Sequence, residues 1–324
     1  MARIGLAWLC ACLLAVAGAA QAQQVDRRIA ITIDDLPWQS DGRPLPADFS
    51  PWHARLMAQL RQARAPIIGF VNEQKLEVGD KADPARVAML GDWLDAGSEL
   101  GNHTYAHESL HDIGVPAFEQ SILDGERQLR PMLASRGTRP RWFRHPYLRT
   151  GTTAADKQVV EAFLDRHGYR VAPVTVDNSE WIWAFAYRRV LEGTAPVVDR
   201  EAELRRLREG YVPYMLNVLD YYERQSIALL GYNLPHVWLV HANELNADTF
   251  AELIAGARRR GYTTITLEEA LRDPAYRRTD GYMGKFGPGW IHRWAVAEKK
   301  PKSFFAGEPE TPKWVMQLAG VEGE

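Results

Sequence analysis

The sequence predicts an α/β fold built on a parallel sheet, either wound open or closed into a barrel. Short apolar runs rich in β-branched residues recur along the chain, and helix-like segments separate them. The helical segments also begin and end at typical residues. Asp83-Pro84 is typical of an N-cap followed by a first-turn proline, and Gly97, Gly168 and Gly261 stand where helices are expected to end.

Strands and helices alternate along most of the chain, which favours parallel pairing because each helix carries the chain back across the sheet. We expect strands at residues 28–33, 66–71, 99–102, 142–144, 170–176, 237–240 and 263–266. We expect helices at residues 51–64, 84–96, 115–134, 157–167, 249–260 and 267–271.

Two segments depart from this alternation. Residues 182–235 are interpreted as a mostly helical insertion between two strands, with helices at 201–208 and 212–230. After residue 272 the chain is rich in glycine, proline and aromatic residues. This composition predicts an irregular C-terminal extension, residues 273–324, that packs on a main domain spanning residues 23–272.

Residues 1–22 are typical of a cleaved signal peptide. Arg3 is the only charged side chain there, residues 4–20 are an apolar run, and Ala20-Gln21-Ala22 forms a small-x-small cleavage pattern. A membrane anchor is the alternative, but the run is short for a span of about 20 residues. We therefore expect an exported, periplasmic or secreted protein with no stable membrane anchor after cleavage.

Both cysteines, Cys10 and Cys12, fall in the predicted signal peptide. The mature chain then has no disulfide and no thiolate zinc site, so any metal ion must be held by histidine and carboxylate. The formal net charge is −2 and no long block of like charge occurs, which gives no reason to expect nucleic acid. The sequence carries no signal for the oligomeric state.

The first candidate site residues are two acids at the end of the first predicted strand, Asp34 and Asp35. Adjacent carboxylates repel each other, so a fold tolerates them best where a cation or a proton separates their roles. The alternative is a solvated turn after the strand.

Two histidines follow the third predicted strand. His103 and His107 are four residues apart, a spacing at which two imidazoles can meet on one side of a helical turn and share a metal ion. The competing interpretation is a pH-sensitive surface loop.

Three more polar groups follow later strands. Arg144 could hold a carboxylate in a bidentate pair, although an arginine at a strand end is usually a surface cation. The fifth predicted strand is followed by Glu180 and Trp181, and the sixth leads into His241, for which a hydrogen-bonded core histidine is the common alternative. Because the carboxyl ends of the strands converge on one face of a parallel barrel, we expect all these groups to share a site.

Five short segments together resemble the ordered motifs of the polysaccharide deacetylases, carbohydrate esterase family 4. They are residues 32–35 (TIDD) for T-F-D-D, 103–107 (HTYAH) for H-[ST]-x-x-H, 144–147 (RHPY) for R-x-P-Y, 177–181 (DNSEW) for D-x-x-D-W and 239–241 (LVH) for L-x-H. The resemblance covers about residues 28–271 and implies a NodB-like catalytic domain at 23–272. The fold that it implies is a distorted, partly open (β/α)7 barrel.

The resemblance implies a metal-dependent hydrolase that removes acetyl groups from an amino sugar of an acetylated polysaccharide or oligosaccharide. Asp35, His103 and His107 would bind a divalent metal ion, most often zinc. Asp34 would be the base that activates a water on the metal, and Arg144 would pair with Asp34 and keep it ionised.

The resemblance also assigns the residues that face the leaving group and the acetyl group. The main-chain amide of Tyr147 would help to hold the oxyanion. Glu180 would orient His241, the acid that protonates the leaving amine. Trp181 and Leu239 would line the acetyl pocket.

The chain departs from the family pattern most at Glu180, where the family has aspartate, because one extra methylene changes the reach toward His241. Two alternatives stay open: an esterase or amidase of the same fold that acts on another substrate such as acetylxylan, and a non-catalytic relative that binds glycan. A glycosidase would need two carboxylates flanking a sugar and no metal.

Overall fold

The computed structural model describes residues 25–323. The predicted signal peptide, residues 1–22, lies outside this range. Among the described residues, no helix combines the length and the apolar character that a membrane crossing requires.

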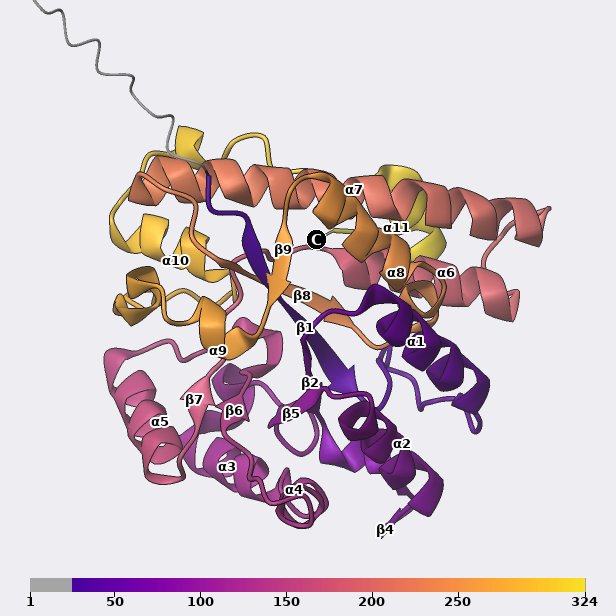
Figure 1. Ribbon diagram of the computed structural model, residues 1–324, viewed down its shortest axis with the longest axis horizontal. Helices are drawn as coiled ribbons and strands as arrows, with labels where there is room; N and C mark the ends of the chain where they lie inside the picture. The colour runs from indigo at the N-terminus through magenta and orange to yellow at the C-terminus, as the bar shows by residue number, and fades with distance from the viewer. Residues whose placement is uncertain (1–24, 324) are drawn as a thin grey trace, which may run out of the picture.

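One curled, parallel sheet of seven strands forms the centre of the molecule, with helices around it (Figure 1). The strand order is β7-β6-β5-β2-β1-β8, and β9 also pairs with β1. The strands are β1 (Arg28–Leu36), β2 (Ile67–Val71), β5 (Glu99–Asn102), β6 (Trp142–Phe143), β7 (Arg170–Val171), β8 (His236–His241) and β9 (Thr263–Ile265). This is the predicted fold class, a distorted and partly open (β/α) barrel.

The distortion of the barrel is centred on β1. Ile29 pairs with both β8 and β9, and Ile31 pairs with both β8 and β2. Strands β9 and β2 therefore follow one another along the same edge of β1, and β8 occupies the opposite edge. On the opposite side of the barrel, the isolated parallel bridge between Val176 and Trp238 is the one sheet pairing, among the described residues, between the chain after β7 and β8. Main-chain hydrogen bonds from Thr175 and Val176 to the Val237 carbonyl support it.

The helices of the strand–helix units are α1 (Ser50–Ala63), α2 (Pro84–Asp95), α3 (Leu110–Asp124), α4 (Leu129–Ala134), α5 (Ala154–Arg166), α8 (Glu244–Arg259) and α9 (Leu267–Ala270). A short hairpin and four 3-10 turns complete these connections and the tail: β3 (Glu77–Val78), β4 (Lys81–Ala82), η1 (Glu73–Leu76), η2 (Pro146–Leu148), η3 (Pro274–Arg277) and η4 (Lys302–Phe305).

The single helix predicted at residues 115–134 is wrong, because the structure has α3 and α4 there. The break falls at Gly125, where a side chain would meet Asn102 and the main chain of Thr104 at 2.9 Å. The Glu73 carboxylate then accepts the main-chain N–H groups of Gln128 and Leu129 and so starts α4.

The insertion contains two helices, α6 (Glu180–Glu192) and α7 (Arg200–Leu230). The prediction missed α6 and divided α7 in two, whereas α7 runs unbroken through Pro213. A proline inside a helix costs a hydrogen bond, but burial of Tyr211 and Met215 on either side of it holds the helix in place. Figure 1 shows α7 crossing the whole molecule beside α6 and α8.

The C-terminal segment is more regular than predicted. It contains α10 (Trp290–Ala297), which packs on α7, and α11 (Lys313–Ala319), which packs on α6. Their apolar residues, among them Trp294 and Val315, are buried in the core. The glycines and prolines therefore lie between helices in this segment and do not prevent helix formation.

The close packing around Gly101 on β5 gives a testable prediction. A methyl group at this position would lie 2.6 Å from the Phe70 ring and 2.9 Å from the carbonyl oxygen of Trp142. Both neighbours are buried, so we expect Gly101→Ala to lower the free energy of unfolding by about 1–3 kcal/mol.

The matched control is Gly91→Ala on α2, where the nearest side-chain atom is 4.0 Å away. Because alanine favours a helix, this control should be neutral or stabilising by up to about 1 kcal/mol. Denaturant unfolding of both variants measures the difference, and equal effects would contradict the packing argument.

Candidate active site

The two acids at the end of β1 point into one cavity because the strand is irregular there. Successive side chains of a strand normally point to opposite faces. Asp35 has a left-handed backbone, φ 71°, and the pairing of β1 with β2 shifts register between Ile33 and Leu36. This bulge turns Asp35 toward the side of Asp34, and both carboxylates line the same cavity.

His103 follows β5 directly and is 2% exposed. Its Nδ1–H donates to the carbonyl oxygen of Arg144 at 2.8 Å, which leaves the lone pair of Nε2 free for a cation. Burial is the main cause that holds the pKa of His103 well below its usual value. A neutral imidazole with this tautomer is the form that binds metal ions.

His107 reaches the same place by a different local conformation from the one predicted. Residues 103–109 form a loop, and Thr104 and His107 have left-handed backbones, φ 68° and 59°. The helical-turn prediction is therefore wrong, although the two imidazoles do meet, with ring centroids 4.8 Å apart. Burial lowers the pKa of His107 to about 4, so it too is neutral.

Asp35, His103 and His107 each bring one ligand atom into a group whose members all lie within 4.8 Å of one another. The Nε2 atom of His107 is 3.6 Å from Oδ1 of Asp35. Burial opposes ionisation of Asp35, but the nearby Lys75 and the imidazoles together lower its pKa. One carboxylate and two neutral imidazoles are a donor set that suits a divalent transition-metal ion.

Arg144 is fully buried beneath Asp34. Its Nη1 donates to Oδ2 of Asp34 at 3.2 Å, and its Nη2 donates to the Thr32 hydroxyl at 3.0 Å. The guanidinium thus divides its donors between two residues, and the bidentate pair suggested by the sequence is wrong. It also lies 4.8 Å from the centroid of the Phe70 ring.

The carboxyl group of Asp34 experiences opposing effects. Burial raises its pKa to about 6, although Arg144 and His241 act in the opposite direction. Its Oδ1 atom is buried and has no hydrogen-bond partner. Arg144 alone therefore does not keep the pKa of Asp34 in the ordinary range, but a group with this pKa is still mostly ionised at neutral pH.

His241 ends β8 and pairs in register with Asp34 on β1. Its Nδ1 lies 2.6 Å from Oε2 of the fully buried Glu180. Oε1 of Glu180 accepts from the side-chain amides of Asn243, at 2.6 Å, and Asn246, at 2.7 Å. The longer side chain of glutamate therefore does reach the imidazole, and both of its oxygens have partners.

The environment of His241 favours its charged form. Burial lowers the pKa, but the Glu180 carboxylate, with smaller contributions from Asp35 and Asp34, raises it to about 9. The site therefore contains a mostly ionised carboxylate, Asp34, and a protonated imidazole, His241, on neighbouring strands. Such a pair can accept one proton and donate another.

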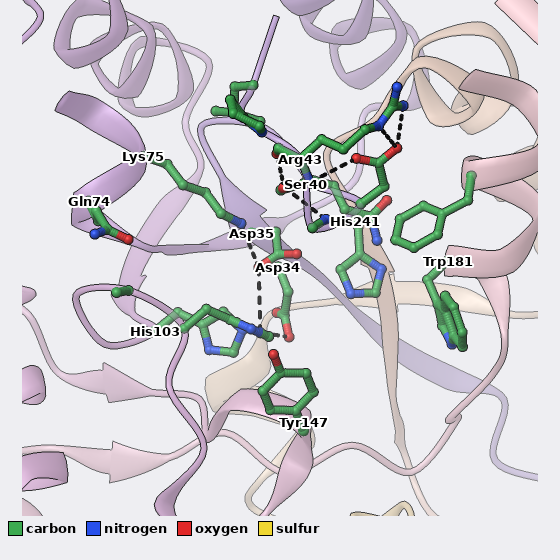
Figure 2. A pocket seen from close by; sticks show the side chains of 18 of the residues that line it. Asp34, Asp35, Ser40, Arg43, Gln74, Lys75, His103, Tyr147, Trp181 and His241 are labelled. Carbon is green, nitrogen blue, oxygen red and sulfur yellow. Dashed lines mark hydrogen bonds and ion pairs between the residues drawn. The ribbon is translucent and has the colours of Figure 1, made fainter. Parts of the chain in front are cut away.

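A cavity of about 1120 Å³ contains these groups. Trp181 of α6 lies near His241 (Figure 2). Phe185 of the same helix also lines the cavity, with its ring centroid 5.4 Å from that of Trp181, and Tyr147 lies against His107, with ring centroids 4.5 Å apart. Leu239 lines its floor at 7% exposure, whereas Tyr147 is 55% exposed at the rim. Of the two insertion helices, α6 lines the cavity and α7 does not.

The structure thus brings all ten predicted site residues to one cavity or directly behind it. The sequence missed Lys75, whose ammonium lies 3.0 Å from Oδ1 of Asp35 (Figure 2). Lys75 follows β2, and the sequence analysis considered no polar group after that strand. Asn243 and Asn246 were also missed, and their place directly after His241 was the available signal.

A family model is similar to part of the chain. Residues 21–171 match the family model described as polysaccharide deacetylase. No curated protein matches the sequence.

Several solved structures are similar to the chain. One is BA3943, a CE4 family pseudoenzyme from Bacillus anthracis, with 13% identity, a TM-score of 0.48, and coverage of 76% of this chain and 66% of that chain. Another is the peptidoglycan deacetylase PdaC from Bacillus subtilis, with 19% identity and a TM-score of 0.46. That match covers 76% of this chain and 92% of that chain. A third is the family 4 carbohydrate esterase from Streptomyces lividans in complex with acetate, with 16% identity and a TM-score of 0.43. That match covers 76% of this chain and 96% of that chain.

The ion pair between Glu180 and His241 gives a prediction about pH. Because the pKa of His241 is raised from 6.5 to about 9, the pair stabilises the fold fully below about pH 6.5, and this stability is lost as the pH rises through about 9. Glu180→Gln removes the charge, so the pKa of His241 should fall by about 1–3 units.

Two measurements test this prediction: the pKa of His241 by NMR titration, and the difference in melting temperature between wild type and variant, which should shrink as the pH rises from 6.5 to about 9. Glu192→Gln is the control, because Glu192 lies on the same helix but pairs with Arg43. An unchanged pKa of His241 in Glu180→Gln would show that another group controls it.

Proposed function

We propose, on the premise that residues 21–171 belong to the polysaccharide deacetylase family, that this protein is a metal-dependent hydrolase that removes N-acetyl groups from amino sugars of a polysaccharide or oligosaccharide. The observation that carries the proposal is the convergence of Asp35, His103 and His107 beside an acid–base pair. The family acts on acetylated glycans; the amino-sugar substrate and the mechanism are our inference.

The donor set fits a divalent metal ion, and zinc is the ion we propose. Asp35, His103 and His107 would hold it, leaving the cavity side open for water and substrate. When bound, the ion lowers the pKa of a coordinated water and polarises the amide carbonyl. The buried Oδ1 of Asp34, which has no hydrogen-bond partner, is consistent with a further group in this part of the site.

Asp34 is the proposed base. It removes a proton from the attacking water while Arg144, 3.2 Å away, stabilises the carboxylate form. Its raised pKa, about 6, makes it a stronger base than an ordinary aspartate and leaves it mostly ionised at neutral pH.

His241 is the proposed acid. Its imidazolium gives a proton to the amine nitrogen as the carbon–nitrogen bond breaks, and Glu180 orients the ring through Nδ1. The contacts of Glu180 with Asn243 and Asn246 fix the carboxylate, so the proton donor is held in one orientation before substrate arrives.

The remaining residues would position the acetyl group. The main-chain N–H of Tyr147 would donate to the developing oxyanion, which is worth about 10²–10³ in kcat for one such donor. Trp181 and Leu239 would enclose the methyl group. The aromatic side chains of Trp181, Phe185 and Tyr147 also offer faces for a sugar ring.

Cellular placement is part of the same proposal. A signal peptide at residues 1–22 would export the protein to the periplasm or the exterior, where glycan polymers occur. Residues 1–24 lie outside the described structure, so export rests on the sequence pattern.

The proposed function is tested by acetate release from N-acetylglucosamine oligomers, peptidoglycan and acetylated xylan, with and without a chelator. We expect release from an amino-sugar substrate, loss with the chelator, and recovery with zinc. Asp34→Asn should keep its metal and lose about 10²–10⁴ in kcat, whereas His107→Ala should lose metal and activity together.

Metal content by elemental analysis separates the two variants. A fully active Asp34→Asn would refute the base assignment. Activity on xylan alone would support the esterase alternative, and no release from any substrate by a zinc-loaded protein would support a non-catalytic glycan-binding relative.

Lys75 gives a second prediction for the same site. Its ammonium lies 3.0 Å from the Asp35 oxygen that would bind the metal, so the two cations repel and compete for one carboxylate. We expect Lys75→Gln to bind zinc at least about tenfold more tightly, a change of about 1.4 kcal/mol. Lys75→Arg keeps the charge and should bind zinc as the wild type does.

Competition with a chromophoric chelator measures these affinities without any substrate. If Lys75→Gln binds zinc no more tightly than wild type and Lys75→Arg, the ammonium does not oppose the metal.

A further inference from the structure

Two successive residues at the rim of the cavity, Tyr147 and Leu148, have left-handed backbones, with φ values of 55° and 53°. Side chains with a Cβ atom rarely adopt this conformation, and it persists only where the surrounding structure holds it. These residues follow β6, which is only two residues long. The turn η2 supplies two main-chain hydrogen bonds here, from Leu148 N–H to the His145 carbonyl and from Arg149 N–H to the Pro146 carbonyl, and another part of the chain adds further restraint.

Arg293 of α10 supplies this restraint. Its side chain is 1% exposed, and its Nη2 donates to the carbonyl oxygen of Leu148. Its Nη1 donates to the Thr150 hydroxyl at 2.9 Å, and its Nε donates to the carbonyl oxygen of Pro288 at 2.7 Å. One guanidinium therefore ties the loop after β6 to the C-terminal segment.

Asp280 holds the guanidinium in place. Its Oδ2 accepts from Nη1 of Arg293 at 2.9 Å, from Nζ of Lys157 at 2.6 Å and from the Thr150 hydroxyl at 2.8 Å. A buried arginine needs such a partner, because an unpaired buried charge is strongly unfavourable. The loop, α5 and the C-terminal segment thus meet at one carboxylate.

Gly287 of the C-terminal segment packs closely against the Tyr147–Leu148 peptide. A Cβ atom at this position would lie 1.8 Å from the carbonyl oxygen of Tyr147 and 3.0 Å from the carbonyl carbon of Leu148. Only glycine permits this approach. Residues 147–149 are therefore held at two adjoining peptides: Arg293 donates to the carbonyl oxygen of the Leu148–Arg149 peptide, and Gly287 packs against the Tyr147–Leu148 peptide.

We propose that Arg293 is a positioning residue for deacetylation: through the Leu148 carbonyl oxygen it holds residues 147–149 in the conformation in which the main-chain N–H of Tyr147 serves the reaction. This inference rests on the proposed function, because the amide of Tyr147 is the proposed oxyanion donor. Arg293 lies outside residues 21–171, which match the family model, so this restraint on the loop after β6 comes from a part of the chain beyond that match.

The test combines a conformational readout with kinetics. Arg293→Met removes every donor, and hydrogen exchange of the peptide covering residues 145–151 should become faster while exchange around His103 and His107 stays unchanged. On the substrate found active, kcat should fall about 10–100-fold, somewhat less than for loss of an oxyanion donor. KM and zinc affinity should stay unchanged, and Arg293→Lys should recover part of kcat.

A second variant disturbs residues 147–149 and leaves Arg293 unchanged. Gly287→Ala should displace the Tyr147 carbonyl and reproduce both the faster exchange and the lower kcat. Gly281→Ala is the matched control in the same segment, since a Cβ atom there would approach only Ala297, at 3.2 Å. It should leave exchange at residues 145–151 and kcat as in wild type.

The outcomes separate this proposal from the proposed function. If Arg293→Met leaves exchange at residues 145–151 and kcat unchanged, the positioning role is wrong. If exchange rises throughout the protein and zinc affinity is lost as well, Arg293 has only a structural role and the proposal is also wrong. If wild type releases no acetate, deacetylation fails, and faster exchange at 145–151 alone then supports the restraint by Arg293.

Discussion

The site depends on one constraint: two adjacent carboxylates, Asp34 and Asp35, must both face a buried cavity. A regular strand cannot do this, because neighbouring side chains alternate between its faces. The bulge at Asp35 solves the geometric problem, and the electrostatic problem then remains. Arg144 lies against Asp34, and Lys75 lies against Asp35. Each acid thereby has its own cation. Burial nevertheless outweighs Arg144 and raises the pKa of Asp34, whereas Lys75 and the imidazoles together outweigh burial and lower the pKa of Asp35.

Much of the fold could be predicted because buried parallel strands are apolar runs in the sequence. All seven strands of the sheet were predicted in the correct order. Where each helix begins, breaks or continues was harder to predict. Helix α7 crosses Pro213 because residues far apart in sequence bury its face, and no local propensity carries that information. The same holds for the break between α3 and α4, which Glu73 controls from the loop after β2. Long-range burial and capping decided the elements that the sequence pattern missed.

The site was predictable to the extent that its residues end strands. Asp34, Asp35 and His241 meet for that reason, since the carboxyl ends of the strands share one side of the barrel. The local shape of the histidine loop was not predictable, because residue type alone does not say which non-glycine residues take left-handed backbones. Lys75 and Arg293 escaped for a related reason. A lysine or arginine side chain is usually solvated, and only the folded chain shows Lys75 against Asp35 and Arg293 buried against the main chain of Leu148.

The single bridge between Val176 and Trp238 is the seam of the barrel. Glu180 lies just beyond one side of this seam and His241 on the other, so their contact works as a clasp across it. A change that separates the two strands here would also separate Glu180 from His241, so the pKa of His241 reports whether this side of the barrel is closed.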